Sequence, residues 1–256
     1  PEQVDGRLLR PLRGATPPST KTDLRYKDLR DFLKLLEAEG ELVRITAPVS
    51  NDLEITAITD LMNKRGEASK ALLFENVPGY DMPVLMNTFG NSRRMNWALG
   101  TSDMNEIAAE IQGMLVPALP KGFLEKLKML PKLAQMAQFP PKLVKDGPVK
   151  EVIDTKPDLL RLPVRKCWPD DAGRFITCGG IYSHDPASGH RNGGLYRMQV
   201  YDGQTTGMHW HRHKGGAEQY RSLRELGKDR MEVACVIGGD PATIYSASAP
   251  LPNGID

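Results

Sequence analysis

Three of the chain's five histidines stand at alternate positions in one short segment, MHWHRHKGG, as His209, His211 and His213. Imidazole is the side chain that proteins use most often to bind transition metals. On a β-strand, neighbouring side chains point to opposite faces, so the three imidazoles would share one face and leave Trp210 and Arg212 on the other. The spacing therefore favours a metal or cofactor site, with an ordinary half-buried strand as the alternative.

A second segment that could do chemistry, RNGGLYRMQVYD, spans residues 191–202. Its paired glycines allow the backbone to approach a ligand, Asn192 offers an amide oxygen, and Arg197 offers a planar guanidinium. An amide oxygen is a hard ligand that suits magnesium or manganese, whereas histidines alone suit zinc, copper or iron. The mixture favours an ion that helps to hold a phosphate. A plain hairpin with a glycine turn is the alternative for this segment alone.

Lys214, Gly215 and Gly216 directly follow the histidines. They offer a cation and open backbone amides at the end of the expected strand, where a phosphate could bind. A Lys-Gly-Gly sequence by itself more often marks only a turn. In combination with the two segments above, it strengthens the prediction of a phosphate site.

The elements that must position these residues are predicted to be β-strands joined by glycine-rich turns. Strand-like patterns occur in four segments of the second half of the chain: Phe175–Tyr182, Gly194–Tyr201, Gly207–His213 and Met231–Ile237. Strands spaced this closely favour a barrel or a sandwich.

The first half of the chain mixes helical and strand patterns. Apolar spacing from Leu29 to Leu36, ended by Gly40, predicts a helix. A second helix is expected to be capped by Asn51, with Glu54 three residues later. The other predicted elements are strands at Glu41–Ile45, Ala71–Val77 and Pro83–Thr88, and helices at Ser102–Met114 and Lys121–Met136.

The predicted fold class is α+β, in two domains. Residues 1–24 have the composition of a flexible leader, residues 25–139 that of an N-terminal α/β domain, and residues 149–256 that of a β-rich domain. The boundary is placed in PPKLVKDGP, between Phe139 and Pro148, because its prolines and its Gly-Pro pair interrupt regular structure.

Composition narrows the classes of partner. With 34 Lys and Arg against 32 Asp and Glu, the net charge is +2, which gives no electrostatic basis for nucleic-acid binding. Cys167, Cys178 and Cys235 are odd in number and contain no CxxC pair, as expected of reduced thiols in a cytoplasmic protein. No window approaches the ~18 apolar residues of a membrane span, although contact with a membrane surface stays open. The expected partners are small molecules and other subunits.

Several longer segments resemble the UbiD family of decarboxylases, in order from Tyr26 to the last residue. They are YKDLRDFLKLLEAEGELVRI, LEITAITD and ALLFENVPGYDMPVLMN in the first half, and CWPDDAGRFIT, NGGLYRMQVYD, HWHRHKGGA and GGDPATIYSASAPLP in the second.

This resemblance implies a split β-barrel domain over residues 149–256 that binds prenylated FMN, with Mn²⁺ bridging the phosphate and K⁺ nearby. The reaction it implies is a reversible, non-oxidative decarboxylation of an aromatic or α,β-unsaturated carboxylic acid. A 4-hydroxybenzoate-type acid of quinone biosynthesis is the expected substrate. A flavin prenyltransferase would supply the cofactor, and a homo-oligomer is the expected assembly.

The resemblance also assigns roles to individual residues. Asn192 and His213 match metal ligands, so only one of the three histidines is expected on the metal, and His211 is expected to face the cofactor. Arg197 is the expected catalytic residue, which would hold a catalytic carboxylate and orient the acid. The cofactor-binding residues implied are Leu195, Tyr196, Arg197, His209, Trp210, His211, Lys214 and Gly215.

The family pattern continues past the point where this sequence ends. A glutamate that completes the metal site, and two more that work with Arg197, would follow residues 250–256. If 256 residues are the whole protein, little or no activity is expected; if they are part of a longer chain, the family interpretation stands. Two alternatives stay open: a flavin-binding half-protein without activity, and a cupin-like metalloenzyme with His209 and His211 as ligands, although no histidine follows His213.

Overall fold

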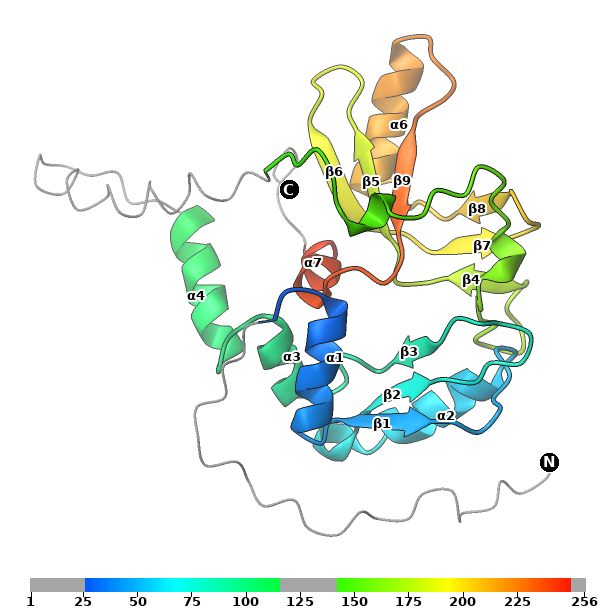
Figure 1. Ribbon diagram of the computed structural model, residues 1–256. Helices are drawn as coiled ribbons and strands as arrows, with labels where there is room; N and C mark the ends of the chain where they lie inside the picture. The colour runs from blue at the N-terminus through cyan, green and yellow to red at the C-terminus, as the bar shows by residue number, and fades with distance from the viewer. Residues whose placement is uncertain (1–25, 116–141, 250–256) are drawn as a thin grey trace, which may run out of the picture.

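A computed structural model describes residues 26–115 and 142–249 of the chain. Within these residues the fold is mixed α/β, with three separate three-stranded sheets and helices packed around them (Figure 1). The predicted leader at residues 1–24, the predicted helix Lys121–Met136 and the C-terminal residues 250–256 lie outside the described residues.

The first sheet has the strand order β1-β2-β3. β1 (Leu42–Ile45) is parallel to β2 (Ala71–Phe74), and β3 (Val84–Met86) is antiparallel to β2. All four residues of β2 are buried, which accounts for its unbroken apolar run, because a central strand is covered on both faces. Each of these strands lies within a segment predicted as a strand, so the three predictions are confirmed.

The first helix, α1 (Leu29–Ala38), also confirms its prediction. A side-chain oxygen of Asp28 caps it by accepting a backbone N–H of the first turn, and Gly40, with φ of +67°, turns the chain behind it. Phe32 and Leu36, four residues apart, are fully buried on one face. Burial of side chains of this size contributes roughly 1.5–3 kcal/mol each.

The next helix, α2 (Glu54–Asn63), begins differently from the prediction. Asn51 does not cap it; the residue before the helix is Leu53, whose φ is 65° and which makes no side-chain cap. The Asn51 side chain donates instead to the Val164 carbonyl, at 2.9 Å. Glu54 is the first residue of the helix, not the third after its cap, and its carboxylate accepts the backbone N–H of Ser50 at 2.7 Å. A long-range contact has therefore displaced the local cap.

Three further helical elements complete the first half: the 3-10 turn η2 (Gly66–Ala68), α3 (Ser92–Ala98) and α4 (Met104–Leu115). α4 confirms the helix predicted to start at Ser102, two residues earlier. α3 was not predicted; it is short, and Asn91 caps it by accepting the N–H of Arg94. Two apolar clusters fill this half, one centred on Ile55, Leu72 and Phe74 and the other on Phe32, Leu36 and Ala98.

The second half contains two antiparallel sheets, with the strand orders β4-β7-β8 and β6-β5-β9. The strands are β4 (Arg174–Ile176), β5 (Gly180–His184), β6 (Arg191–Leu195), β7 (Met198–Val200), β8 (Thr206–Met208) and β9 (Val233–Val236). The helical elements are η3 (Pro148–Lys150), η4 (Leu159–Arg161), α6 (Gly215–Glu225) and α7 (Pro241–Ser246).

Two of the predicted strands are each divided between these sheets. Phe175–Tyr182 contributes to β4 and then to β5, and Gly194–Tyr201 contributes to β6 and then to β7. The single-strand predictions were wrong because a switch from one sheet to the other leaves the apolar pattern unchanged. Strands that change sheets in this way make the corners of barrels and orthogonal sandwiches. The described strands form no closed barrel, however, since β8 and β9 remain edge strands.

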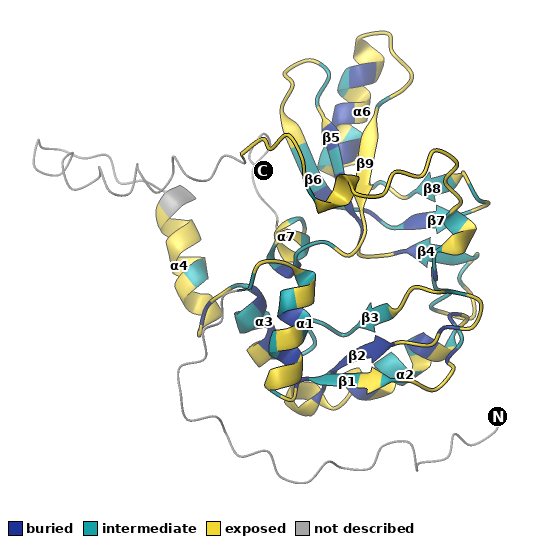
Figure 2. Ribbon diagram, in the orientation of Figure 1, coloured by how far each residue is buried: buried dark blue, intermediate teal, exposed yellow. Residues whose placement is uncertain are grey.

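All four residues of β9 are exposed, as Figure 2 shows, and the strand Met231–Ile237 was predicted in this place. α7 follows and contacts the first half: the rings of Tyr245 and Phe89 lie 6.4 Å apart. The two halves also meet where Arg174 donates to the Tyr80 hydroxyl at 2.6 Å. Among the described residues, no helix is long and apolar enough to cross a membrane.

Candidate functional site

The three histidines lie in a loop rather than on a strand. β8 ends at Met208, and the backbone turns between His211 and Lys214, where the Lys214 N–H donates to the His211 carbonyl, before α6 begins. The predicted strand Gly207–His213 was therefore wrong beyond Met208. α6 was not predicted either, and its start is the reason that the strand ends early.

The imidazole rings nevertheless contact one another along the loop. The centroids of His209 and His211 are 4.8 Å apart, with 3.4 Å between their Nε2 atoms, and the centroids of His211 and His213 are 5.8 Å apart. All three side chains are exposed. Among the described residues, no group of three or more His, Cys, Asp or Glu side chains is arranged to hold a metal ion. The cupin-like alternative thus gains no support.

Trp210 points the other way, into the protein. Its ring contacts those of Tyr196 and Tyr220, with centroids 6.1 and 5.9 Å away. Its Nε1 atom is buried and has no hydrogen-bond partner among the described residues. Because an unpaired buried donor costs about 1–3 kcal/mol, such an atom marks a position where a ligand could accept a hydrogen bond.

The N-terminus of α6 lies against the side chains of β6 and the residue that follows it. The backbone N–H of Gly216 donates to the Tyr196 hydroxyl at 3.0 Å, and the Asn192 amide donates to the same hydroxyl at 3.5 Å. A Cβ atom on Gly215 would lie 2.2 Å from Asn192 Oδ1, and one on Gly216 would lie 3.0 Å from Trp210 Nε1. A side chain at either position would therefore force Asn192 or Trp210 to shift, so the two glycines favour this close approach.

This helix start has the properties of an anion-binding site. α6 has 11 residues, its N-cap is Lys214, and that side chain makes no cap hydrogen bond. The first amides of a helix and its dipole favour a negative group, and the Lys214 ammonium adds a full charge. Asn192 and His213 lie near the start of α6. Asn192 lies against Gly215, and His213 precedes Gly215 by two positions in the chain. The donor set fits a phosphate-bearing cofactor.

Arg197 stands between β6 and β7, where the chain changes sheets, and its carbonyl accepts the N–H of His209 at 3.0 Å. The guanidinium pairs with Asp171 through Nη2–Oδ2 at 2.8 Å and Nη1–Oδ1 at 3.3 Å. It also lies over the Phe175 ring, 4.0 Å from the centroid. The hydrogen bonds with Asp171 raise the pKa of Arg197, and the same bonds lower the pKa of Asp171. Leu195, the last residue of β6, is half-buried opposite Gly180.

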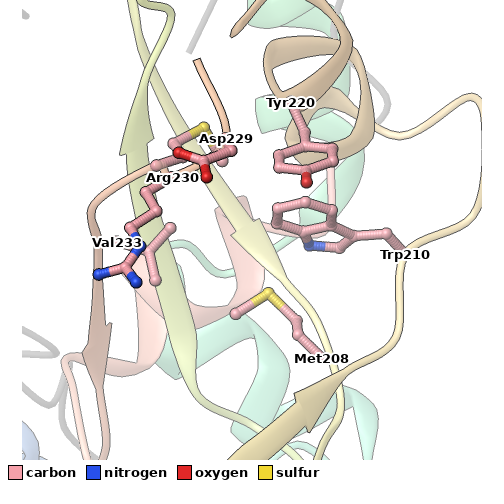
Figure 3. Close-up of a pocket in the computed structure, with 7 residues that line it drawn as sticks. Met208, Trp210, Tyr220, Asp229, Arg230 and Val233 are labelled. Carbon is pink, nitrogen blue, oxygen red and sulfur yellow. The ribbon is translucent and has the colours of Figure 1, made fainter. Parts of the chain in front are cut away.

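A cavity of about 410 Å³ opens beside Trp210, between the edge strands β8 and β9. Figure 3 shows Tyr220 and Trp210 close together on one side of it and Arg230 and Val233 on the other. The full lining is Met208, Trp210, Tyr220, Asp229, Arg230, Met231 and Val233. Of the residues predicted from the sequence, only Trp210 lines it.

Sequence reasoning missed Tyr220 because it missed α6. A signal for that helix existed, since Gly216, Gln219 and Leu223 recur at helical spacing and all are buried. It also missed Asp171, which the sequence WPDD marks only as a turn.

Two family models match the chain. Residues 33–111 match the N-terminal domain of the 3-octaprenyl-4-hydroxybenzoate carboxy-lyases, and residues 142–256 match their Rift-related domain. The chain belongs to the UbiD family. The family predicted from the sequence is thus confirmed, and both matches follow the order of the segments that carried the resemblance.

UbiD relatives are similar over most of this chain. An uncharacterized protein of Aquifex aeolicus is 49% identical over 233 residues, which are 91% of this chain and 48% of that protein. The UbiD-class enzyme HmfF of Pelotomaculum thermopropionicum, solved with FMN, is 28% identical with a TM-score of 0.70, over 90% of this chain and 46% of that one.

The vanillic acid decarboxylase of Sedimentibacter hydroxybenzoicus, in its closed form, is 27% identical with a TM-score of 0.73, and the match again covers 90% of this chain and 46% of that one. The chain thus spans about half the length of these proteins that it matches. Those solved structures share the mixed α/β fold described above.

Proposed function

We propose that this UbiD protein catalyses the reversible, non-oxidative decarboxylation of an aromatic or α,β-unsaturated carboxylic acid with prenylated FMN. The observation that carries the proposal is the start of α6, where Lys214, two closely approached glycines and the unpaired Trp210 Nε1 fit a phosphate-bearing cofactor. HmfF, solved with FMN, supports the choice of a flavin. When bound, the prenylated flavin supplies an electron sink for the bond that breaks as carbon dioxide leaves.

The chain's own residues would bind and orient the reactants. The amides at the start of α6 other than that of Gly216, together with Lys214, would hold the cofactor's phosphate, while Asn192 and His213 would bind Mn²⁺ beside it. A glutamate after residue 256 would complete that metal site, as the family resemblance implies, and K⁺ would lie nearby. Tyr196, Trp210 and the half-buried Leu195 would form the wall behind the flavin, with His209 and His211 on the loop that encloses it.

Arg197 would orient the substrate. Its planar guanidinium can bind a carboxylate through two parallel hydrogen bonds, which fixes the acid relative to the flavin. A glutamate beyond residue 256, held by the same arginine, would provide the proton that replaces carbon dioxide. A 4-hydroxybenzoate-type acid of quinone biosynthesis is the substrate we propose, in line with the description of the matched domains.

The test uses the native full-length protein and the 256-residue chain, each produced with and without a flavin prenyltransferase. The measurements are flavin absorbance, manganese content, oligomeric state, and carbon dioxide release from 4-hydroxybenzoate, vanillate and cinnamate. We expect release by the full-length protein only when the prenyltransferase is present, with about one manganese per chain. Full flavin loading without release from any acid would contradict the proposal.

The same experiment decides the second candidate, a flavin-binding unit without activity of its own. For the 256-residue chain, this candidate rests on Asn192 and His213, the two metal ligands that the family resemblance assigns within it. Flavin bound by that chain without carbon dioxide release, next to an active full-length protein, is the result it predicts.

A further inference from the structure

Arg197 needs to be held before it can orient an acid. Its side chain is 35% exposed, and its backbone lies in the break between β6 and β7. A long side chain in such a position has many rotamers, and each productive encounter would have to select one of them. Groups that fix the guanidinium beforehand would therefore increase the rate of reaction.

Asp171 is built to act as such a group. Its carboxylate takes one N–H from each terminal nitrogen of Arg197, at 2.8 and 3.3 Å. The carboxylate is itself fixed, because Oδ2 also accepts the Trp168 N–H at 3.1 Å, and the Asp171 N–H donates back to the Trp168 carbonyl. The Asp171 side chain is only 12% exposed. The turn thus places the carboxylate independently of the arginine.

Phe175 holds the guanidinium in a second direction. Its ring lies under the plane of the guanidinium, 4.0 Å from Cζ to the centroid, while Asp171 holds the edge. Phe175 is on β4 and pairs in register with Gln199 on β7, the strand that follows Arg197. The edge contact with Asp171 and the face contact with Phe175 together fix the position and the plane of the Arg197 guanidinium. Asp171 takes two of the five N–H groups, so the pair does not saturate the guanidinium.

We infer that Asp171 and Phe175 are positioning residues, which hold the guanidinium of Arg197 in the orientation that receives the carboxylate of the acid. This inference rests on the proposed function, in which Arg197 binds the substrate. Neither residue touches the reacting atoms in this assignment, and both act through Arg197.

The main test compares Asp171→Asn, Asp171→Glu and Asp170→Asn in the flavin-loaded full-length protein. Asp170 is the matched control, since it is the neighbouring residue of the same turn and is exposed. We expect Asp171→Asn to lower kcat/KM by about 10²-fold with unchanged flavin content, because a misplaced catalytic group costs on this order. Asp171→Glu should recover part of the loss, and Asp170→Asn should match the wild type. A wild-type kcat/KM for Asp171→Asn would overturn the inference.

A second measurement needs no turnover and separates this inference from the proposed function. Phenylglyoxal modifies arginine side chains, and the rate at Arg197 can be followed by mass spectrometry of its peptide. We expect slow modification in the wild type, slower still with 4-hydroxybenzoate, and fast, unprotected modification in Asp171→Asn. Equal rates and equal protection in the two proteins would overturn the inference. If the flavin-loaded wild type shows protection but releases no carbon dioxide, the proposed function fails and the positioning role remains.

Phe175→Leu tests the face contact alone. Leucine keeps an apolar side chain on β4 but removes the aromatic ring, so we expect a several-fold loss in kcat/KM, smaller than that of Asp171→Asn. An effect larger than that of Asp171→Asn would show that the ring, and not the carboxylate, sets the position of Arg197.

Discussion

Two arginine–carboxylate pairs in this protein have the same shortest distance and opposite surroundings. Arg94 and Glu41 are 2.8 Å apart in the first half, with side-chain exposures of 0% and 2%. Arg197 and Asp171 are also 2.8 Å apart, in the second half, with exposures of 35% and 12%. The distance alone would not tell the two pairs apart.

The two pairs differ in how many hydrogen-bond partners each arginine has. Arg94 makes five hydrogen bonds, which equals the five donors of a guanidinium; the acceptors are Glu41, the carbonyls of Ser69, Asn87 and Thr88, and the Ser69 hydroxyl. Glu41 is likewise held by Lys70 and Asn91. A buried charge must be fully paired, because each unpaired group inside the protein is costly.

Arg197 is held differently, because Asp171 takes only two of its donors and Phe175 covers one face. A pair in which all five donors of the arginine are used stabilises the fold. A pair that fixes an arginine through only some of its donors leaves the others for a ligand. Substitutions in the two pairs should therefore separate stability from activity.

The largest expected effect is on stability, from Arg94→Ala. This change removes the fully buried partner of Glu41 and leaves the acceptors around the guanidinium without their donor, and breaking a buried pair costs about 3–5 kcal/mol. Urea unfolding followed by circular dichroism measures the free energy. The control is Arg93→Ala, whose side chain is 62% exposed and should contribute about 0–1 kcal/mol. Equal losses for the two variants would refute the contrast between saturated and open pairs.

Arg197→Ala should show the reverse pattern. We expect carbon dioxide release to fall at least about 10²-fold while flavin stays bound, as is typical when an aligned electrostatic group is removed. The free energy of unfolding should change by about 0–1 kcal/mol, because the pair is open to solvent. Retained turnover in the full-length protein would remove Arg197 from the mechanism.

Gly215→Ala tests the proposed phosphate-binding site at the start of α6. The added methyl group would lie 2.2 Å from Asn192 Oδ1, so the helix start or the Asn192 side chain must move. We expect flavin affinity to fall about tenfold, or ~1.4 kcal/mol, measured as flavin retained after dialysis. Gly227→Ala, just past the far end of the helix, serves as a control for backbone strain away from the site, because Gly227 has a φ of +72° and open space around it. Unchanged retention in Gly215→Ala would contradict the placement of the phosphate.

The smallest effect concerns pH and the buried pair. Burial raises the pKa of Glu41, but hydrogen bonds from Lys70, Arg94 and Asn91 outweigh it, so the folded-state pKa lies below the ordinary value of 4.5. Glu41 therefore stabilises the protein above about pH 4.5, and this contribution is lost as the pH falls through the folded-state pKa. We expect the free energy of unfolding to fall by up to about 1.4 kcal/mol per pH unit below pH 4.5, and to fall less steeply in Glu41→Gln. Urea unfolding between pH 3 and pH 7 measures both dependences.

The sequence predicted the first half well, where local patterns decide. α1 and the three strands of the first sheet follow from apolar spacing and from turn residues such as Gly40. Asn51 was misassigned because its side chain serves Val164, 113 positions away. The Arg94–Glu41 pair spans 53 positions and lay beyond any local pattern.

Prediction was less complete in the second half, where long-range geometry decides. The switches between sheets at Thr177–Gly179 and at Tyr196 and Arg197 leave no mark in an alternating pattern, so two strands were predicted where four exist. The family resemblance drew attention to the segments around Arg197 and Trp210, and the roles that it assigns there stay predictions. It did not reveal Asp171, because only the fold brings that carboxylate across 26 positions to the guanidinium.

The link from Asn51 and Leu53 to the segment Val164–Lys166, which forms only isolated β-bridges, has a consequence for the order of folding. Leu53 donates to the Lys166 carbonyl, and the neighbouring Arg165 carbonyl accepts the N–H of Phe175, the residue beneath Arg197. Contacts between such distant positions form only after the chain between them has closed into a loop, so they are slow to form. We therefore expect the surroundings of Arg197 to be among the last parts of the chain to reach their native state, after the first sheet has formed.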